Sequence, residues 1–142
     1  MARPVDDMVW SHERDNMARA ELDIYTETVD GVTVVTLVGP VDSATFDQYK
    51  QALDRLCRTE TAPRLAIDCR QLSYINSKGI GLLASLHRQV MIQMGNIALF
   101  GLSSRILKTL ELLGLGKRLR IYETREEALA SFLPEDNGAP EA

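Results

Sequence analysis

The sequence predicts an α/β domain whose mixed, mostly parallel sheet is opened by one antiparallel hairpin and accompanied by about four helices. Three observations carry this prediction. Runs of β-branched and apolar residues alternate along the chain with segments in which apolar residues recur at helical spacing. The dipeptide Asp30-Gly31, typical of a two-residue hairpin turn, separates the first two runs. The 142 residues, 45% hydrophobic and 25% charged, suit one domain with a sizeable core.

Two strands open the predicted domain, at residues 22–28 and 32–38. The second is rich in β-branched residues and apolar on both faces, which is typical of a strand covered on both sides. After Gly39-Pro40 the apolar period becomes helical, and Asp42 or Ser43 is available as the N-cap of the first helix. The apolar face of that helix comprises Phe46, Tyr49, Leu53 and Leu56.

A second pair of strand and helix follows Pro63. The strand, Leu65 to Ile67, is short and fully apolar and ends at Asp68. The helix is expected to run from about Gly79 to Met94, and Gly95-Asn96 ends it. Its apolar face comprises Leu83, Leu86 and Val90.

A third pair begins with a buried strand at residues 97–100. Ser103 or Ser104 is expected to cap the helix that follows, and Gly114 to end it in a left-handed conformation. The residues expected on the buried face of this helix are Ile106, Leu107, Leu110 and Leu113.

The fourth pair is a short strand at residues 119–122 and a final helix. Thr124 and Glu127 have the spacing of a capping box, and Pro134 prevents the helix from continuing. The helix is expected to bury Ala128, Leu129, Phe132 and Leu133. Because strands alternate with helices throughout, the strands after the hairpin should be parallel and joined by right-handed crossovers.

The predicted domain spans residues 21–133. Residues 1–20 are expected to form an N-terminal extension that is poorly ordered or a short helix. Residues 134–142, which combine Pro, Gly, Asn and acidic residues, are expected to be a disordered tail. The sequence shows no internal repeat and no second domain.

Composition restricts the partners and the location of the protein. The net charge of −4 disfavours a nucleic-acid partner, and no apolar run is long enough to cross a membrane. The polar, acidic start of the chain has no signal-peptide core, so we expect a cytoplasmic protein. Cys57 and Cys69 lack metal-ligand spacing and are expected to be small buried hydrophobes. We expect no cofactor and no metal.

Three polar groups follow predicted strands, at the sheet edge where α/β folds usually place function. They are Asp42, Asp68 and the run Asn76-Ser77-Lys78-Gly79. Ser77 should lie within a residue or two of the helix start with its hydroxyl partly exposed. Two interpretations stay open: Ser77 only caps the helix, or it accepts a regulatory phosphate, which the free N–H groups and the helix dipole would stabilise.

Motifs of the common enzyme classes are absent, so we expect no catalytic activity. Gly79-Ile80-Gly81 lacks the third glycine of a dinucleotide loop, and Ser77 is not centred in Gly-x-Ser-x-Gly. His87 has no nucleophile in step with it and is expected on the surface. A lesser alternative pairs Asp42 with Asp68 to hold a cation or receive a phosphoryl group, as in receiver domains.

A loose basic cluster surrounds the third predicted helix. It is expected to be a solvated face, with an acidic protein partner as the alternative. Its members are Arg105, Lys108, Lys117, Arg118 and Arg120.

Three segments of the chain, residues 39–45, 72–83 and 113–115, resemble the STAS domain, and in particular the bacterial anti-sigma factor antagonists. The specific segment is Ile75-Asn76-Ser77-Lys78-Gly79-Ile80-Gly81. In the family it usually reads Asp-Ser-Ser/Thr-Gly-Leu/Ile-Gly, with the first serine phosphorylated. The likeness covers residues 21–133, so it implies a single STAS domain without enzymatic activity.

The resemblance implies a partner-switching regulator of transcription. An anti-sigma factor with serine kinase activity phosphorylates the serine, and a serine phosphatase removes the phosphate. The unphosphorylated antagonist binds the anti-sigma factor and frees the sigma factor. Carried over, Ser77 is the phosphoacceptor, and the partner-binding residues are Asp42, Ser43, Asn76, Ser77, Lys78 and Gly79.

Two residues depart from the family pattern. Asn76 replaces the commoner aspartate, and Lys78 replaces a small hydroxyl residue. The Lys78 cation can pair with a phosphate on Ser77 or change which partner fits. The alternative function is a scaffold module of a stressosome-like or transporter-associated complex, in which Ser77 only caps its helix.

Overall fold

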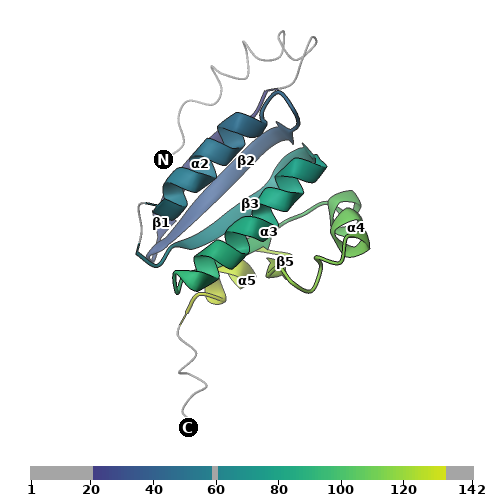
Figure 1. The fold of residues 1–142 in the computed structure, drawn as a ribbon. Helices are drawn as coiled ribbons and strands as arrows, with labels where there is room; N and C mark the ends of the chain where they lie inside the picture. Colours follow the sequence, from purple (N-terminus) through teal and green to yellow (C-terminus); the bar gives the residue numbers. More distant parts are fainter. Residues whose placement is uncertain (1–20, 59–60, 134–142) are drawn as a thin grey trace.

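The computed structural model describes residues 21–58 and 61–133, so the predicted extensions at 1–20 and 134–142 lie outside the described residues (Figure 1). One sheet has the strand order β1-β2-β3-β4-β5. β1 pairs with β2 antiparallel, and the other neighbouring strands are parallel, which confirms the predicted fold class. The strands are β1 (Asp23–Val29), β2 (Val32–Val41), β3 (Arg64–Ile75), β4 (Asn96–Phe100) and β5 (Ile121–Tyr122).

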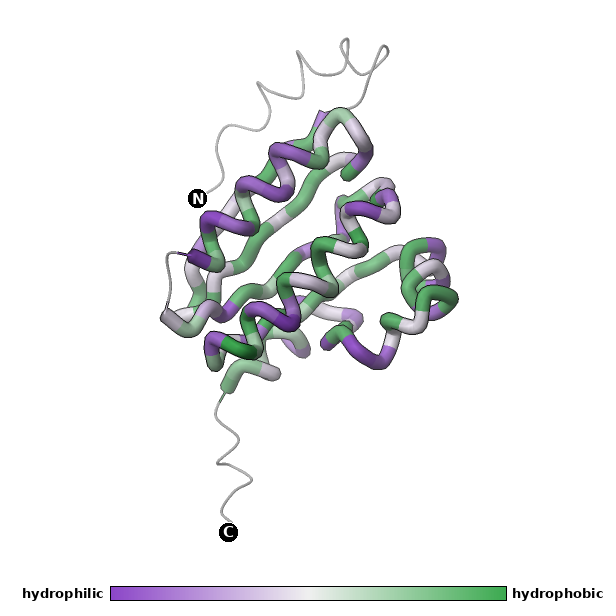
Figure 2. Tube along the Cα trace, in the orientation of Figure 1, coloured by the Kyte–Doolittle hydropathy of each residue, from purple (hydrophilic) through white to green (hydrophobic). Residues whose placement is uncertain are grey.

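Helices cover both faces of the sheet (Figure 1). Their bounds are α2 (Phe46–Arg58), α3 (Ser77–Ile92), α4 (Ser104–Leu112) and α5 (Arg125–Ala130). Side chains alternate along β2, so that Val35 and Leu37 join the core under α2, α3 and α4. Val32 and Val34 join a smaller core on the opposite face, under α5. Figure 2 shows the corresponding contrast between the mainly hydrophobic residues of the central strands and the alternation of hydrophilic and hydrophobic residues along α2 and α3.

The opening hairpin has the predicted turn. Asp30 and Gly31 have φ angles of 50° and 82°, the left-handed pair that a type I′ turn requires. Val29 and Val32, on either side of the turn, are paired in the ladder. The local turn chemistry therefore sets the register of β1 against β2.

β2 extends beyond its predicted end, through Gly39-Pro40 to Val41. A proline is tolerated here because β1 pairs with β2 only as far as Val38, so no ladder bond on that side is lost. Gly39 has φ 114°, and a Cβ there would lie 2.3 Å from the carbonyl oxygen of Glu21. The residues that we expected to end the strand therefore form an irregular segment within it.

β3 also runs further than predicted, to Ile75 rather than to Asp68. β4 pairs with β3 only as far as Asp68, which faces Phe100 across the ladder. Beyond that point β3 has a neighbour on one side only, and it carries exposed polar side chains that resemble a loop in the sequence. Asp68 is therefore inside a strand, and the prediction that it stands at a strand end is wrong.

Three predicted helix boundaries or faces need correction. α3 ends at Ile92, and the left-handed residue after it is Met94 (φ 67°). Gly95 is needed for a different reason, because a Cβ there would lie 2.1 Å from the carbonyl oxygen of Pro63. Leu113 and Leu133 are 55% and 57% exposed, since both follow the last helical residue and the helical period no longer places them.

Both cysteines are buried and free, as predicted. Burial, assisted by the neighbouring Asp54, raises the pKa of the Cys57 thiol to about 11. Burial also raises the pKa of Cys69. Both thiols are protonated at neutral pH, which makes them poor nucleophiles and poor metal ligands. Among the described helices, none combines the length and the apolar character needed to cross a membrane.

Candidate functional site

Two turns meet where β2 and β3 end, at the edge of the sheet that holds their arrowheads in Figure 1. Val41 and Ile75 are paired at the last position of the ladder. The next backbone N–H, that of Asn76, donates to the carbonyl oxygen of Val41 at 2.9 Å. The turn that leads into α2 therefore lies beside the turn that leads into α3.

The first turn is held by Asp42 and Thr45. The Asp42 carboxylate accepts hydrogen bonds from the backbone N–H groups of Ala44 (3.0 Å) and Thr45 (3.1 Å). The Thr45 hydroxyl donates to the carbonyl oxygen of Pro40 at 2.8 Å and accepts from the Asp42 N–H at 3.0 Å. Asp42, one of the two residues predicted to cap this helix, thus caps the turn that precedes α2, while Ser43 and Ala44 are exposed at the tip of the turn.

The second turn places Ser77 at the first position of α3. Asn76 is the N-cap, with φ −87° and ψ 176°, and its side-chain oxygen accepts from the Gly79 N–H at 2.8 Å. The predicted position and exposure of Ser77 are confirmed, but the interpretation of Ser77 as the cap is wrong. Within the part of the chain that the structure describes, the Ser77 hydroxyl forms no hydrogen bond.

A buried hydrogen bond between Tyr49 and Gly79 links α2 to α3 beneath the two turns. The buried Tyr49 hydroxyl donates to the carbonyl oxygen of Gly79 at 2.8 Å. Burial raises the pKa of Tyr49 well above its usual value, so the phenol remains a neutral donor. A Cβ at position 79 would lie 2.7 Å from Ile75 and 2.8 Å from Val41, so only glycine fits without a shift.

The role of Tyr49 was missed by the sequence interpretation, which placed this residue only in the core. The available signal was general: a buried tyrosine hydroxyl usually needs a hydrogen-bond partner. Nothing in the spacing identified that partner as Gly79, which lies 30 residues further along the chain.

Lys78 is exposed and leans across to α2. Its amino nitrogen lies 4.6 Å from the centre of the Phe46 ring, within the range of a cation–π interaction. Lys78 therefore adds a positive charge between the starts of the two helices. A dianion at Ser77 would meet this charge, the free N–H groups of the first turn and the positive end of a 16-residue helix.

The alternative pairing of Asp42 with Asp68 is wrong. Both carboxylate oxygens of Asp68 accept from the Arg70 guanidinium, at 3.0 and 2.8 Å. Asp68 and Ile75 lie in the same strand, seven residues apart, which corresponds to about 23 Å at 3.3 Å per residue. The Asp42 turn follows Val41, which is paired with Ile75, so Asp68 is far from it. Among the described residues, no group of three or more His, Cys, Asp or Glu side chains is placed to hold a metal ion.

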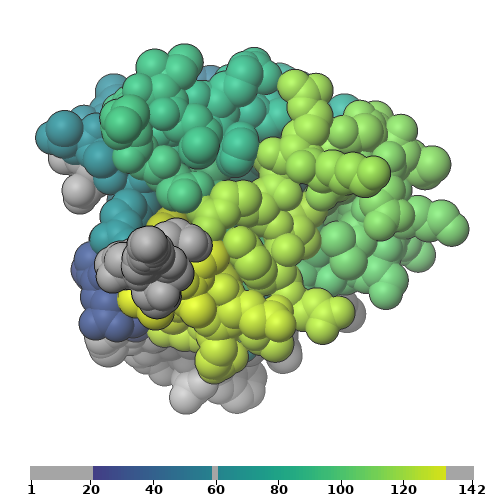
Figure 3. Space-filling model, turned by 90° about the horizontal axis from the view of Figure 1, so that it is seen from below, coloured from purple at the N-terminus to yellow at the C-terminus, as the bar shows by residue number. Residues whose placement is uncertain are grey.

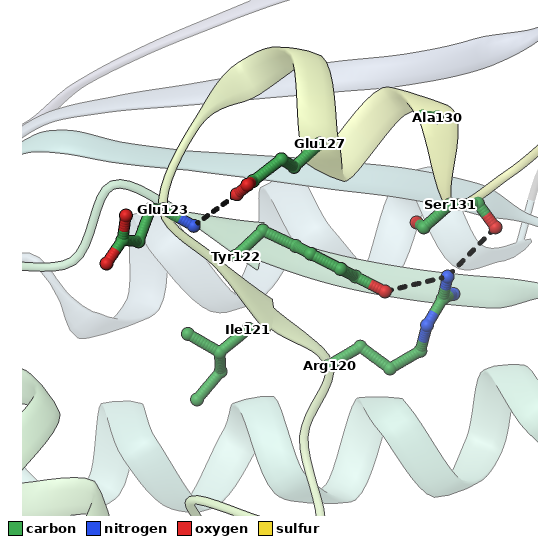
Figure 4. A pocket seen from close by; sticks show the side chains of 7 residues that line it. All are labelled: Arg120, Ile121, Tyr122, Glu123, Glu127, Ala130 and Ser131. Atoms are coloured by element: carbon green, nitrogen blue, oxygen red, sulfur yellow. Dashed lines mark hydrogen bonds between the residues drawn. The ribbon is translucent and has the colours of Figure 1, made fainter.

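The basic cluster is smaller than predicted, because Arg120 is not part of the solvated face. Its guanidinium donates to the carbonyl oxygen of Ser131 at 3.0 Å and to the Tyr122 hydroxyl at 3.4 Å (Figure 4). These residues line an open hollow of about 650 Å³ between β5 and α5. The other members of the cluster, Arg105, Lys108, Lys117 and Arg118, are exposed.

His87, expected on the surface, is partly buried on α3. Burial and the nearby positive charge of Arg120 lower the pKa of its imidazole. The ring is therefore neutral at neutral pH and adds no charge to this side of the domain.

Comparison with known proteins gives one consistent result. The family model described as "STAS domain" matches residues 23–128. The chain is 24% identical over 111 residues to the anti-sigma F factor antagonist of Paenibacillus polymyxa, and the match covers 78% of this chain and 95% of that protein.

Solved structures agree with this match. A crystal structure of an anti-sigma factor antagonist from Mycobacterium paratuberculosis superposes with a TM-score of 0.71 at 25% identity, over 78% of this chain and 93% of that one. The Bacillus cell fate determinant SpoIIAA in its phosphorylated form superposes with a TM-score of 0.60 at 22% identity, over 78% of this chain and 100% of that one. The second likeness is one of fold.

Proposed function

The chain belongs to the STAS domain family, and on this premise we propose that it is an anti-sigma factor antagonist controlled by reversible phosphorylation of Ser77. In the unphosphorylated form it binds an anti-sigma factor and so releases a sigma factor. The anti-sigma factor is also the serine kinase that modifies Ser77. A serine phosphatase restores the binding form.

The observation that carries the proposal is that Asn76 and Ser77 have different structural roles. Asn76 caps α3, so the hydroxyl of Ser77 has no structural task and is exposed to solvent. A phosphate on it would occupy the N-terminal end of α3, where unpaired N–H groups and Lys78 favour negative charge. The scaffold alternative, in which Ser77 serves as the helix cap, lacks this support.

The six proposed partner-binding residues have different roles in the proposal. Ser43, Ser77 and Lys78 are exposed and contact the partner directly. Asp42 and Asn76 are partly buried and hold the two turns through their capping bonds. Gly79 is buried and acts only through its backbone.

The relatives support the proposal at the level of the family. The Paenibacillus polymyxa protein is named for antagonism of an anti-sigma F factor. The SpoIIAA protein has been solved in a phosphorylated form, so a protein of this fold accepts a phosphate without losing its architecture. Ser77 is the residue of this chain that corresponds to the phosphorylated serine of the family motif.

Phosphate transfer tests the proposal. The native chain, incubated with ATP and its purified anti-sigma kinase, should gain one phosphate, and mass spectrometry of the fragments should place it on Ser77. Ser77→Ala should gain none. Ser73→Ala is the matched control, because this serine is exposed near the end of β3 and is not one of the proposed partner-binding residues, so the variant should be modified normally. Modification of Ser77→Ala to the native level would contradict the assignment.

A further inference from the structure

A groove lies between the C-terminal half of α3 and the segment that connects α4 to β5. Seen from below in Figure 3, the green surface of α3 borders the yellow-green surface of this connecting segment. The groove encloses about 440 Å³. The residues that line it are Ala84, His87, Arg88, Met91, Ile92, Leu115, Arg118 and Leu119.

The groove is lined by apolar side chains, two of which are strongly exposed. Met91 and Ile92, on its α3 wall, are 47% and 81% exposed. Seven large hydrophobic residues are exposed in the described part of the chain, and Met91 and Ile92 are the two of them that line this groove. An exposed hollow with an apolar lining is a candidate surface for binding a protein or another ligand.

Each wall of this apolar groove carries an arginine side chain. Arg88 belongs to α3 and Arg118 to the opposite segment, and both are exposed. Neither forms an ion pair with a described residue. The lower pKa of His87 keeps its imidazole neutral, so the arginines are the charges that a ligand would meet. The complementary ligand is apolar along one face and acidic along the flanks.

Self-association does not satisfy this charge pattern. In a two-fold dimer built on this face, each groove would meet the same face of the second copy. Arg88 and Arg118 would then approach the arginines of the other protomer, and the described groove offers no carboxylate to offset them. The pattern therefore favours a different protein over a second copy of this chain.

We propose that this groove is a second protein-binding site, which takes an acidic amphipathic helix of a partner protein. Apolar side chains at i, i+3 or i+4 and i+7 of that helix would enter the groove, and its flanking Asp or Glu residues would pair with Arg88 and Arg118. Arg88 lies eleven residues along α3 from Ser77, about 16 Å at 1.5 Å per residue. The inference is therefore independent of the phosphorylation proposal.

Selection from a displayed library of random 16-residue peptides tests the inference. Peptides retained on the full-length native chain should be rich in Asp and Glu and should carry apolar residues at helical spacing. The strongest of them, titrated into isotope-labelled protein, should shift backbone resonances in residues 84–92 and 112–119. Retention of basic peptides, or shifts confined to residues 42–46 and 76–79, would overturn the proposal.

Charge reversal gives the decisive comparison. The double variant Arg88→Glu with Arg118→Glu should bind the selected peptide at least tenfold more weakly, while Ser77→Asp should bind it as the native chain does. Arg55→Glu with Arg58→Glu is the matched control, because these exposed arginines on α2 change the net charge equally. Equal weakening of peptide binding in both double variants would overturn the inference. So would a native chain that is dimeric in solution and becomes monomeric in the variant Arg88→Glu with Arg118→Glu.

Discussion

Ser77→Asp should bind the anti-sigma factor at least tenfold more weakly than the native chain, while Ser77→Ala should bind it nearly as well. The added carboxylate would lie on the exposed first residue of α3, inside the proposed interface. The fold tolerates it, because the helix N-terminus favours negative charge. A close interface does not, since the charge must be desolvated or must face acidic groups of the partner.

Alanine is expected to be harmless for a reason that the structure supplies. Asn76, rather than Ser77, caps the helix, and no described residue hydrogen-bonds to the Ser77 hydroxyl. Titration calorimetry of the native chain and the two variants against the purified anti-sigma factor measures the effect. Ser85→Asp, an exposed serine further along the same helix, controls for charge in general and should keep native affinity. Equal affinities for Ser77→Asp and Ser77→Ala would contradict the switch.

Gly79→Ala should destabilise the domain by about 1–3 kcal/mol, the usual cost of an extra group in a well-packed core. The new methyl group would lie 2.7 Å from Ile75 and 2.8 Å from Val41, both of them buried. Relief requires α3 to move away from the ends of β2 and β3. That movement would also disturb the bond from Tyr49 to the carbonyl of Gly79.

Gly81→Ala is the matched control and should have the opposite sign. A Cβ at position 81 would meet no atom within 4 Å, and the residue lies inside a helix. Alanine in such a position gains about 0.5–1 kcal/mol over glycine. Urea unfolding of the two variants should therefore move the midpoint in opposite directions. A stabilised or unchanged Gly79→Ala variant would show that the start of α3 is not constrained as described.

Local chemistry made much of the fold predictable from sequence. Asp30-Gly31 determines its turn through backbone conformation, and Thr124 with Glu127 forms the expected capping box. Each of these signals lies within a few residues of the chain. The strand ends were less predictable, because they depend on partners far away in sequence. β3 continues past Asp68 since β2 still pairs with it, although β4 no longer does.

The candidate site was also predictable only in part. Its location and the exposure of Ser77 follow from a polar run placed directly before an apolar helical stripe. The identity of the N-cap residue could not be predicted from the sequence, because Asn76 and Ser77 are both good capping residues. The Asn76 N–H donates to the carbonyl oxygen of Val41, at the end of the neighbouring strand. Asn76 has the extended conformation of an N-cap residue. The bond between Tyr49 and Gly79 was equally hidden, since it joins two helices.

Release of the sigma factor is the most direct test of the proposed function. The purified complex of anti-sigma factor and sigma factor is mixed with increasing amounts of the full chain, and free sigma factor is measured by size-exclusion chromatography. The native chain should release the sigma factor until the complex is exhausted, and the Ser77-phosphorylated chain should release little at the same concentrations. A sigma factor that stays bound at every concentration of the unphosphorylated chain would contradict the account.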